Sequence, residues 1–104
     1  MEYVQHKLAS GRTVDVRGRS YDEWDAYEQE RLSCLEQTGQ MFMDGQTAQA
    51  EIKVGQDYRA FREKRLALWV ADWPAVRGTL SLRDVAEIER VCADLEKEEV
   101  EQKN

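Results

Sequence analysis

The chain has 104 residues, of which 41% are hydrophobic and 35% charged, and its formal net charge is −6 at pH 7. This length suits a single domain with a modest core. The apolar runs stay well below the roughly 20 residues of a membrane-spanning helix, and the N-terminus lacks the basic start and apolar core of a signal peptide. The acidic balance argues against electrostatic binding to nucleic acid, which requires a basic surface. We therefore expect a cytoplasmic protein.

The N-terminal residues 1–17 predict a β-hairpin. Apolar and polar side chains alternate in residues 3–8 and again in residues 13–17, and Gly11 between them can adopt a positive φ. An isolated hairpin is only marginally stable in water. We therefore expect it to pack on the helices or to pair with another strand.

A first helix is predicted over residues 21–38. Ser20 and Glu23 have the spacing of a capping box. Gly39 is a typical C-terminal stop. An apolar stripe at helical spacing follows the cap and consists of Tyr21, Trp24, Leu32 and Leu35.

A second helix is predicted over residues 47–72, after a turn signal at Asp44-Gly45. Gly55 weakens a helix by about 1 kcal/mol relative to alanine, so we expect a bend or fraying there. Pro74 disfavours helical geometry at Trp73 and should end the helix.

A third helix is predicted over residues 81–99, starting at the Ser81-x-x-Asp84 cap. Its buried face should consist of Leu82, Val85, Ile88, Cys92 and Leu95. The polar residues 100–104 are expected to fray. The predicted fold class is α+β, mainly α: a single domain, residues 1–104, with an N-terminal β-hairpin followed by three helices.

The two cysteines, Cys34 and Cys92, lie far apart, each in a predicted helix and without Cys-x-x-Cys spacing. We expect free thiols, buried or half-buried, with no disulfide or metal role.

Two opposite charges fall where a core residue belongs. On a helical wheel Glu28 lies in the apolar stripe of the first helix, and Arg65 lies in that of the second. Because either charge alone would be costly to bury, one hypothesis is a structural Glu28–Arg65 ion pair. The alternative is that each side chain extends to solvent along its stem. A catalytic glutamate is a third, weaker reading.

The sequence predicts no enzyme, cofactor or metal site. His6 stands alone on the hairpin, without the partner that general acid–base catalysis needs. The acidic pairs lack metal-ligand spacing, and the glycines are too far apart for a phosphate loop.

The candidate partner-binding residues are Met41, Phe42, Met43 and Trp73. We expect the three tryptophans, Trp24, Trp69 and Trp73, to be mainly core. In the alternative, Trp73 joins the Met-Phe-Met cluster in an exposed apolar surface. The cluster is our preferred interface candidate because it stands in an otherwise polar loop.

The order of these elements resembles a tail assembly chaperone of long-tailed bacteriophages. The resemblance is carried by the hairpin Lys7–Arg17 with the capped helix directly after it. A late Val70-Ala71-Asp72-Trp73-Pro74-Ala75-Val76 segment leads to Leu80-Ser81-Leu82-Arg83-Asp84 and a final amphipathic helix. Pro74 departs from the family, where a glycine-rich stretch commonly follows the tryptophan. Residues 40–55 match no part of it.

The resemblance implies a non-enzymatic protein that binds the tape-measure protein while the tail tube polymerises in the host cytoplasm. It also implies self-association and no catalytic residues. An acidic protein with an adaptable apolar patch would suit this role physically, because its charge keeps the complex in solution.

A competing hypothesis is a small phage or mobile-element inhibitor, or an adaptor, that binds a host nucleic-acid-binding protein. The chain is acidic from Asp94 onward and basic between Arg59 and Arg65. Carboxylates of the last helix could bind a basic groove, with an affinity that falls steeply as salt is added.

Overall fold

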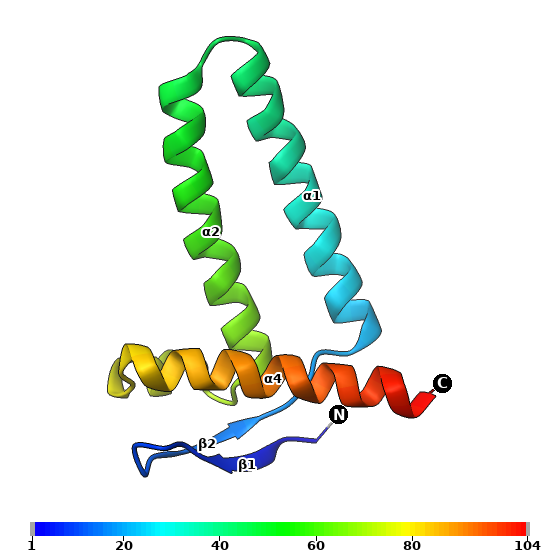
Figure 1. The fold of residues 1–104 in the computed structure, drawn as a ribbon, viewed down its shortest axis with the longest axis vertical. Coiled ribbons are helices and arrows are strands. Elements are labelled where there is room, and N and C mark those ends of the chain that lie inside the picture. Colours follow the sequence, from blue (N-terminus) through cyan, green and yellow to red (C-terminus); the bar gives the residue numbers. More distant parts are fainter. Residues whose placement is uncertain (1, 104) are drawn as a thin grey trace. The chain divides into compact units, whose positions relative to one another are not determined.

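The computed structural model describes residues 2–103, and the side chains of residues 2–97. Figure 1 shows an N-terminal β-hairpin followed by helices, which confirms the predicted fold class. The elements in chain order are β1 (Val4–Lys7), β2 (Thr13–Val16), α1 (Tyr21–Met43), α2 (Thr47–Trp69), α3 (Trp73–Val76), the 3₁₀ turn η1 (Arg77–Thr79) and α4 (Leu82–Lys103).

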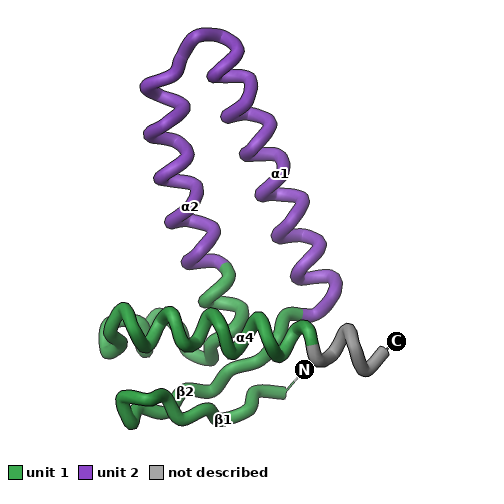
Figure 2. The backbone as a smooth tube through the Cα atoms, viewed as in Figure 1, with its two compact units in different colours: residues 1–19, 65–104 green, residues 20–64 purple. Residues whose placement is uncertain are grey.

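The chain divides into two compact units (Figure 2). Unit 1 combines residues 1–19 with residues 65–104, and unit 2 is the continuous segment 20–64. The single domain expected from the sequence stays a prediction. No helix among the described residues is long and apolar enough to cross a membrane.

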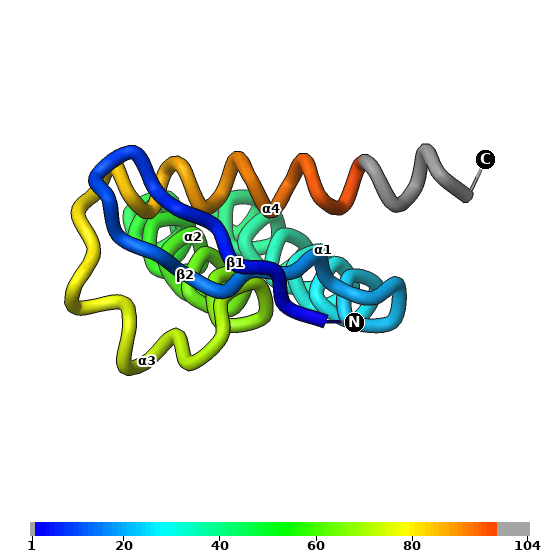
Figure 3. Tube along the Cα trace, turned by 90° about the horizontal axis from the view of Figure 1, so that it is seen from below, coloured from blue at the N-terminus to red at the C-terminus, as the bar shows by residue number. Residues whose placement is uncertain are grey.

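The β-hairpin of unit 1 is confirmed as an antiparallel pair in which His6 lies opposite Val14. Gly11 has a φ of 95°, as the turn requires. The hairpin lies along α4 (Figure 3), where Ser10 Oγ donates to Asp84 at 2.7 Å. It is also extended by a short antiparallel bridge between Val16 and Val70. The expected pairing with a further segment is therefore present.

That bridge explains where α2 ends. The Arg17 amide donates to the Trp69 carbonyl, and the Ala71 amide donates to the Asp15 carbonyl. These backbone groups pair with β2 and its continuation, so the helix ends at Trp69, three residues before the predicted end. Asp72 has a φ of 53° and turns the chain into the short helix α3, which carries Pro74 in its first turn.

The core of unit 1 joins the hairpin to α2, α3 and α4. Its members are Leu8, Val14, Val16, Leu66, Trp69, Val70, Trp73, Ile88 and Cys92. The Ser81–Asp84 cap is confirmed, since each side chain accepts from the amide of the other residue. The helix α4 extends to Lys103, beyond the predicted end at 99, and Asn104 lies outside the described residues.

Unit 2 is a helical hairpin formed by α1 and most of α2. The Ser20–Glu23 capping box is confirmed. The prediction that Gly39 ends the helix is wrong, because α1 continues to Met43 and turns at Gly45, which has a φ of 80°. The expected fraying at Gly55 is absent, because α2 runs unbroken through it. A glycine inside a helix lowers its stability without breaking it, and packing against a second helix outweighs that cost.

Candidate protein-binding surface

We call the line of contact between α1 and α2 in unit 2 the seam. Two aromatic rings pack against each other at one end of it. Tyr27 and Phe61 meet edge to face with their centroids 5.5 Å apart, and both are buried. The Tyr27 hydroxyl donates to the Phe61 carbonyl at 3.3 Å. Nearby, Lys64 pairs with Glu30 across the hairpin.

The middle of the seam is polar. Lys53 Nζ donates to the Cys34 carbonyl at 3.1 Å and to Thr38 Oγ1 at 3.0 Å, and it pairs with Asp57 on its own helix. Thr38 is buried and Lys53 is half-buried. Unit 2 therefore uses polar groups at positions where an antiparallel helix pair ordinarily buries apolar ones.

Large apolar side chains lie instead on a neighbouring stripe of α1 that is exposed. Trp24 is 42% exposed and Leu35 is 52% exposed. The full stripe consists of Tyr21, Trp24, Glu28, Leu32, Leu35, Gly39 and Phe42. The steps of three and four residues keep all of these positions on one side of the helix.

The exposed apolar residues Val54 and Tyr58 of α2 share a face with this stripe. Successive residues of an α-helix are rotated by about 100° around the helix axis. The exposed stripe of α1 is therefore rotated by about 100° from the residues of α1 that face α2. Val54 and Tyr58 are rotated by about 80°, in the same direction, from the residues of α2 that face α1. Because the two helices are antiparallel, turns of the same sense lead to the same side of the hairpin. We call this side the apolar face, made of Trp24, Leu32, Leu35, Phe42, Val54 and Tyr58.

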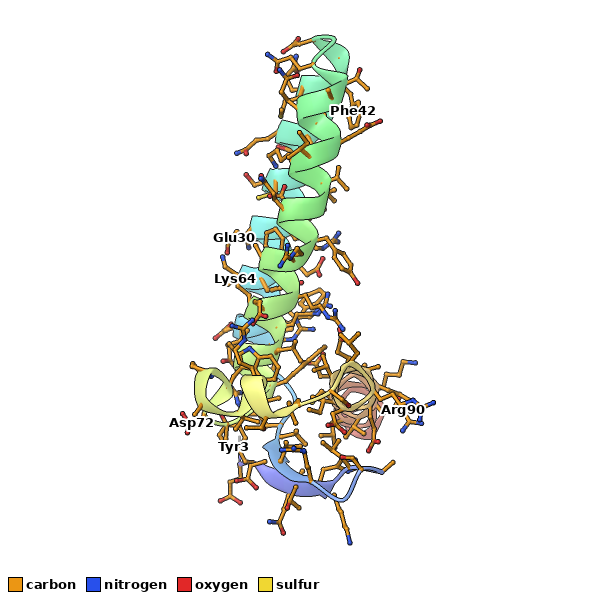
Figure 4. The ribbon with its side chains drawn as sticks, turned by 90° about the vertical axis from the view of Figure 1, so that its left-hand side faces the viewer. Tyr3, Glu30, Phe42, Lys64, Asp72 and Arg90 are labelled. Carbon is orange, nitrogen blue, oxygen red and sulfur yellow. The ribbon has the colours of Figure 1, made fainter. Side chains whose placement is uncertain are left out.

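The opposite side of the hairpin is mainly polar, although it also carries Ile52, which is 62% exposed. Figure 4 shows Glu30 and Lys64 on one edge of the hairpin and Phe42 on the other edge. By the same wheel geometry, the polar side also carries Gln37, Gln49, Gln56 and Glu63. The contrast between the two sides marks the apolar face as a surface of unit 2 suited to covering by protein.

The structure places the predicted binding residues in two different environments. Phe42 and Met43 are exposed at the end of α1, with 82% of Met43 accessible, and Met41 is half-buried. They lie in the last helical turn rather than in a loop. Trp73 is only 5% exposed in the core of unit 1, so it is not part of an exposed surface there.

The tryptophan prediction is right for Trp69 and Trp73 and wrong for Trp24. The α1 stripe that contains Trp24 was expected to be core, but it forms the exposed face. The signal that could have found this is a second stripe of α1 beside the first: Tyr27, Arg31, Cys34, Thr38 and Met41. A helix that packs against a single partner helix buries only one of two neighbouring stripes.

The residues of the predicted ion pair belong to different units. Within unit 2, Glu28 accepts from Arg31 at 2.8 Å, one turn along the same helix. Within unit 1, Arg65 donates to Glu89 at 3.2 Å. The Glu28–Arg65 pair itself stays a prediction.

Polar side chains of unit 1 form hydrogen bonds between the β-hairpin and α4. His6 Nε2 lies 2.9 Å from Glu87, which also accepts from the Ala9 amide. That amide and His6 hold the pKa of Glu87 below its usual value. Within the described residues, no group of three or more His, Cys, Asp or Glu side chains is placed to hold a metal ion.

Glu96 on α4 is the centre of a second group of hydrogen bonds in unit 1. It accepts from the backbone amide, Nε and Nη2 of Arg19, and from Trp69 Nε1, all at 2.8–2.9 Å. Burial alone would raise the pKa of Glu96, but these donors outweigh it and keep the pKa below its usual value.

Comparisons with protein-family models, with curated proteins and with solved structures give no match for this chain.

Proposed function

We propose that the protein is a tail assembly chaperone of a long-tailed bacteriophage. In the cytoplasm of the host cell it would bind the tape-measure protein without catalysis and keep that protein covered while the tail tube assembles. The observation that supports this most is the apolar face of unit 2, with Leu35 and Tyr58 more than half exposed.

The chemistry of this face suits a helical protein partner. Apolar side chains that recur every three or four residues can receive the matching stripe of an amphipathic helix. Trp24 and Phe42 provide large, weakly hydrated contacts of the kind enriched at interfaces. The net charge of −6 would keep a complex with an aggregation-prone helical protein in solution.

The experiment is capture of the tape-measure protein encoded beside this chain, from cells that express both. Leu35→Glu changes the apolar face, and Gln37→Glu makes the same change of charge on the polar side of the same helix. We expect wild type and Gln37→Glu to retain the tape-measure protein and Leu35→Glu to lose it. Helical circular dichroism should show that both variants fold.

Salt separates this role from an acidic inhibitor. Apolar contacts should survive 0.5 M salt, whereas contacts between carboxylates and a basic groove should not. Capture of a host nucleic-acid-binding protein that is released by salt, with no tape-measure protein retained, would contradict the chaperone proposal.

A further inference from the structure

The large apolar residues of the apolar face of unit 2 are arranged symmetrically about its middle. In α1, Leu32 and Leu35 are equally far from a midpoint between Ser33 and Cys34. Trp24 and Phe42 flank the same midpoint at nearly equal distances. Between Trp24 and Phe42, Glu28 lies on one side of this midpoint and Gly39 lies on the other side.

The helix α2 repeats this arrangement about a midpoint near residue 56. Val54 and Tyr58 lie two residues to either side of it, and Glu51 and Arg62 lie five and six residues away. Wheel geometry puts all four on the side of the apolar face.

The two midpoints are level with each other. Lys53 bonds to Cys34 and Thr38, and Phe61 packs on Tyr27. Between these contacts, residue 56 comes to the height of residues 33 and 34. One twofold axis across the middle of the face can therefore pass through both midpoints.

We propose that a second copy of this chain covers the apolar face, with its hairpin antiparallel to the first, about this axis. Leu32 then packs on Leu35 of the second copy, Val54 packs on Tyr58, and Trp24 packs on Phe42. Such an interface is isologous, because each contact occurs twice. The four helices form an antiparallel bundle whose core is the face that unit 2 alone leaves open.

The charges on the face fit this arrangement. Glu51 of one copy comes opposite Arg62 of the other, twice in the dimer. Glu28 comes opposite Gly39, where a Cβ would meet no atom within 4 Å, so there is room for the carboxylate and for Arg31 bound to it. A parallel dimer would instead put Phe42 opposite Thr47 and Glu51, without an apolar contact for its ring.

The area of the face is sufficient for a stable dimer. Within unit 2, α1 has 23 residues and α2 contributes residues 47–64, which correspond to lengths of about 34 Å and about 27 Å, and each helix is about 10 Å wide. The dimer would bury about 600 Å² per copy and about 1,200 Å² in total, which is at the lower end of the usual range of specific interfaces. The inference does not depend on the chaperone role. If both hold, partner and second copy compete for one face.

The first test is sedimentation of the full chain at several concentrations. Wild type and Gln37→Glu should sediment as dimers, and Leu35→Glu should raise the dissociation constant at least about tenfold. Glu51→Arg should also weaken the dimer, and Glu51→Arg combined with Arg62→Glu should restore it, because both new pairs are again opposite. A wild-type monomer at all concentrations would overturn the proposal, even if the tape-measure protein is captured.

Cross-linking tests the orientation. Benzophenone-alanine replaces Phe42, and dimers are mixed from ¹⁴N and ¹⁵N chains so that links between copies have a distinct mass. The antiparallel dimer predicts links from position 42 to the neighbourhood of Trp24 in the other copy. Links to the neighbourhood of Thr47 in the other copy, or links within one chain only, would overturn it.

Discussion

Glu96 shows how one carboxylate can hold three segments of unit 1 together. It takes four hydrogen bonds from Arg19 and Trp69, and the Arg19 guanidinium also lies over the Trp69 ring at 5.0 Å from the centroid. Glu96→Gln keeps the size but removes the charge and one acceptor oxygen. We expect a loss of about 2 kcal/mol in the free energy of unfolding, measured by urea denaturation. Glu89→Gln, on the same helix, is the matched control and should lose less.

The pH dependence of stability follows from the same carboxylate. The pKa of Glu96 is lower in the folded than in the unfolded chain, so its contribution is fully present above the unfolded value of about 4.3. That contribution is lost as the pH falls through the lowered folded value. Glu96→Gln should therefore show a smaller loss of stability than wild type between pH 5 and pH 3. Asp84 and Glu87, whose pKa values are also lowered, remain in the variant and leave it some acid sensitivity. An equal slope in both proteins would contradict the assignment.

Cys92 is a buried thiol whose reactivity should report on unfolding. Burial, followed by the nearby charge of Glu96, raises its pKa to about 12. At pH 8 almost no thiolate is present, so iodoacetamide should leave Cys92 unmodified in the native protein and alkylate it in urea. Peptide mass spectrometry distinguishes Cys92 from Cys34. Rapid native alkylation of Cys92 would place it outside the core.

At the level of elements, the parts found correctly from sequence are those with local causes. The hairpin depends on alternation around Gly11, and two helix starts depend on the reciprocal caps of Ser20 and Ser81. The end of α2 was displaced because Val70 pairs with Val16, fifty-four positions earlier in the chain, and no local signal encodes that bridge. The apolar face was missed for a related reason. The stripe of Trp24 and Leu35 is more apolar than the stripe of Cys34 and Thr38, and only the partner helix decides which one is buried.

Glycine substitutions test where α1 and α2 turn and whether α2 is continuous through Gly55. Gly45 has a positive φ, so Gly45→Ala should destabilise the turn by about 1 kcal/mol. Gly55 is inside α2 with open space around a Cβ, so Gly55→Ala should stabilise by about 0.5–1 kcal/mol. Thermal unfolding of both variants should give shifts of opposite sign. A stabilising Gly45→Ala would mean that α1 and α2 do not turn there.

Across the whole molecule, burial is distributed unevenly between the units. Unit 1 encloses an apolar core around Val16, Trp69 and Ile88, whereas the seam of unit 2 buries Tyr27, Thr38, Ala50 and Phe61 with a lysine among them. Local stability follows buried apolar contact. In dilute solution, hydrogen exchange should therefore be slowest at the amides of unit 1 and faster in α1 and the first turns of α2.

Protein concentration should change this pattern in unit 2 alone. If a second copy covers the apolar face, association adds stability to the segment that makes the interface, by mass action. Amides of residues 28–39 should then exchange more slowly at high concentration, while those around Val16 and Ile88 stay unchanged. Leu35→Glu should remove the dependence and Gln37→Glu should keep it. An unchanged exchange rate in α1 from micromolar to millimolar protein would contradict the covered face. A helical hairpin with a polar seam and an apolar outer face gains stability from whatever binds that face, so the protection of its amides should depend on whether the face is covered.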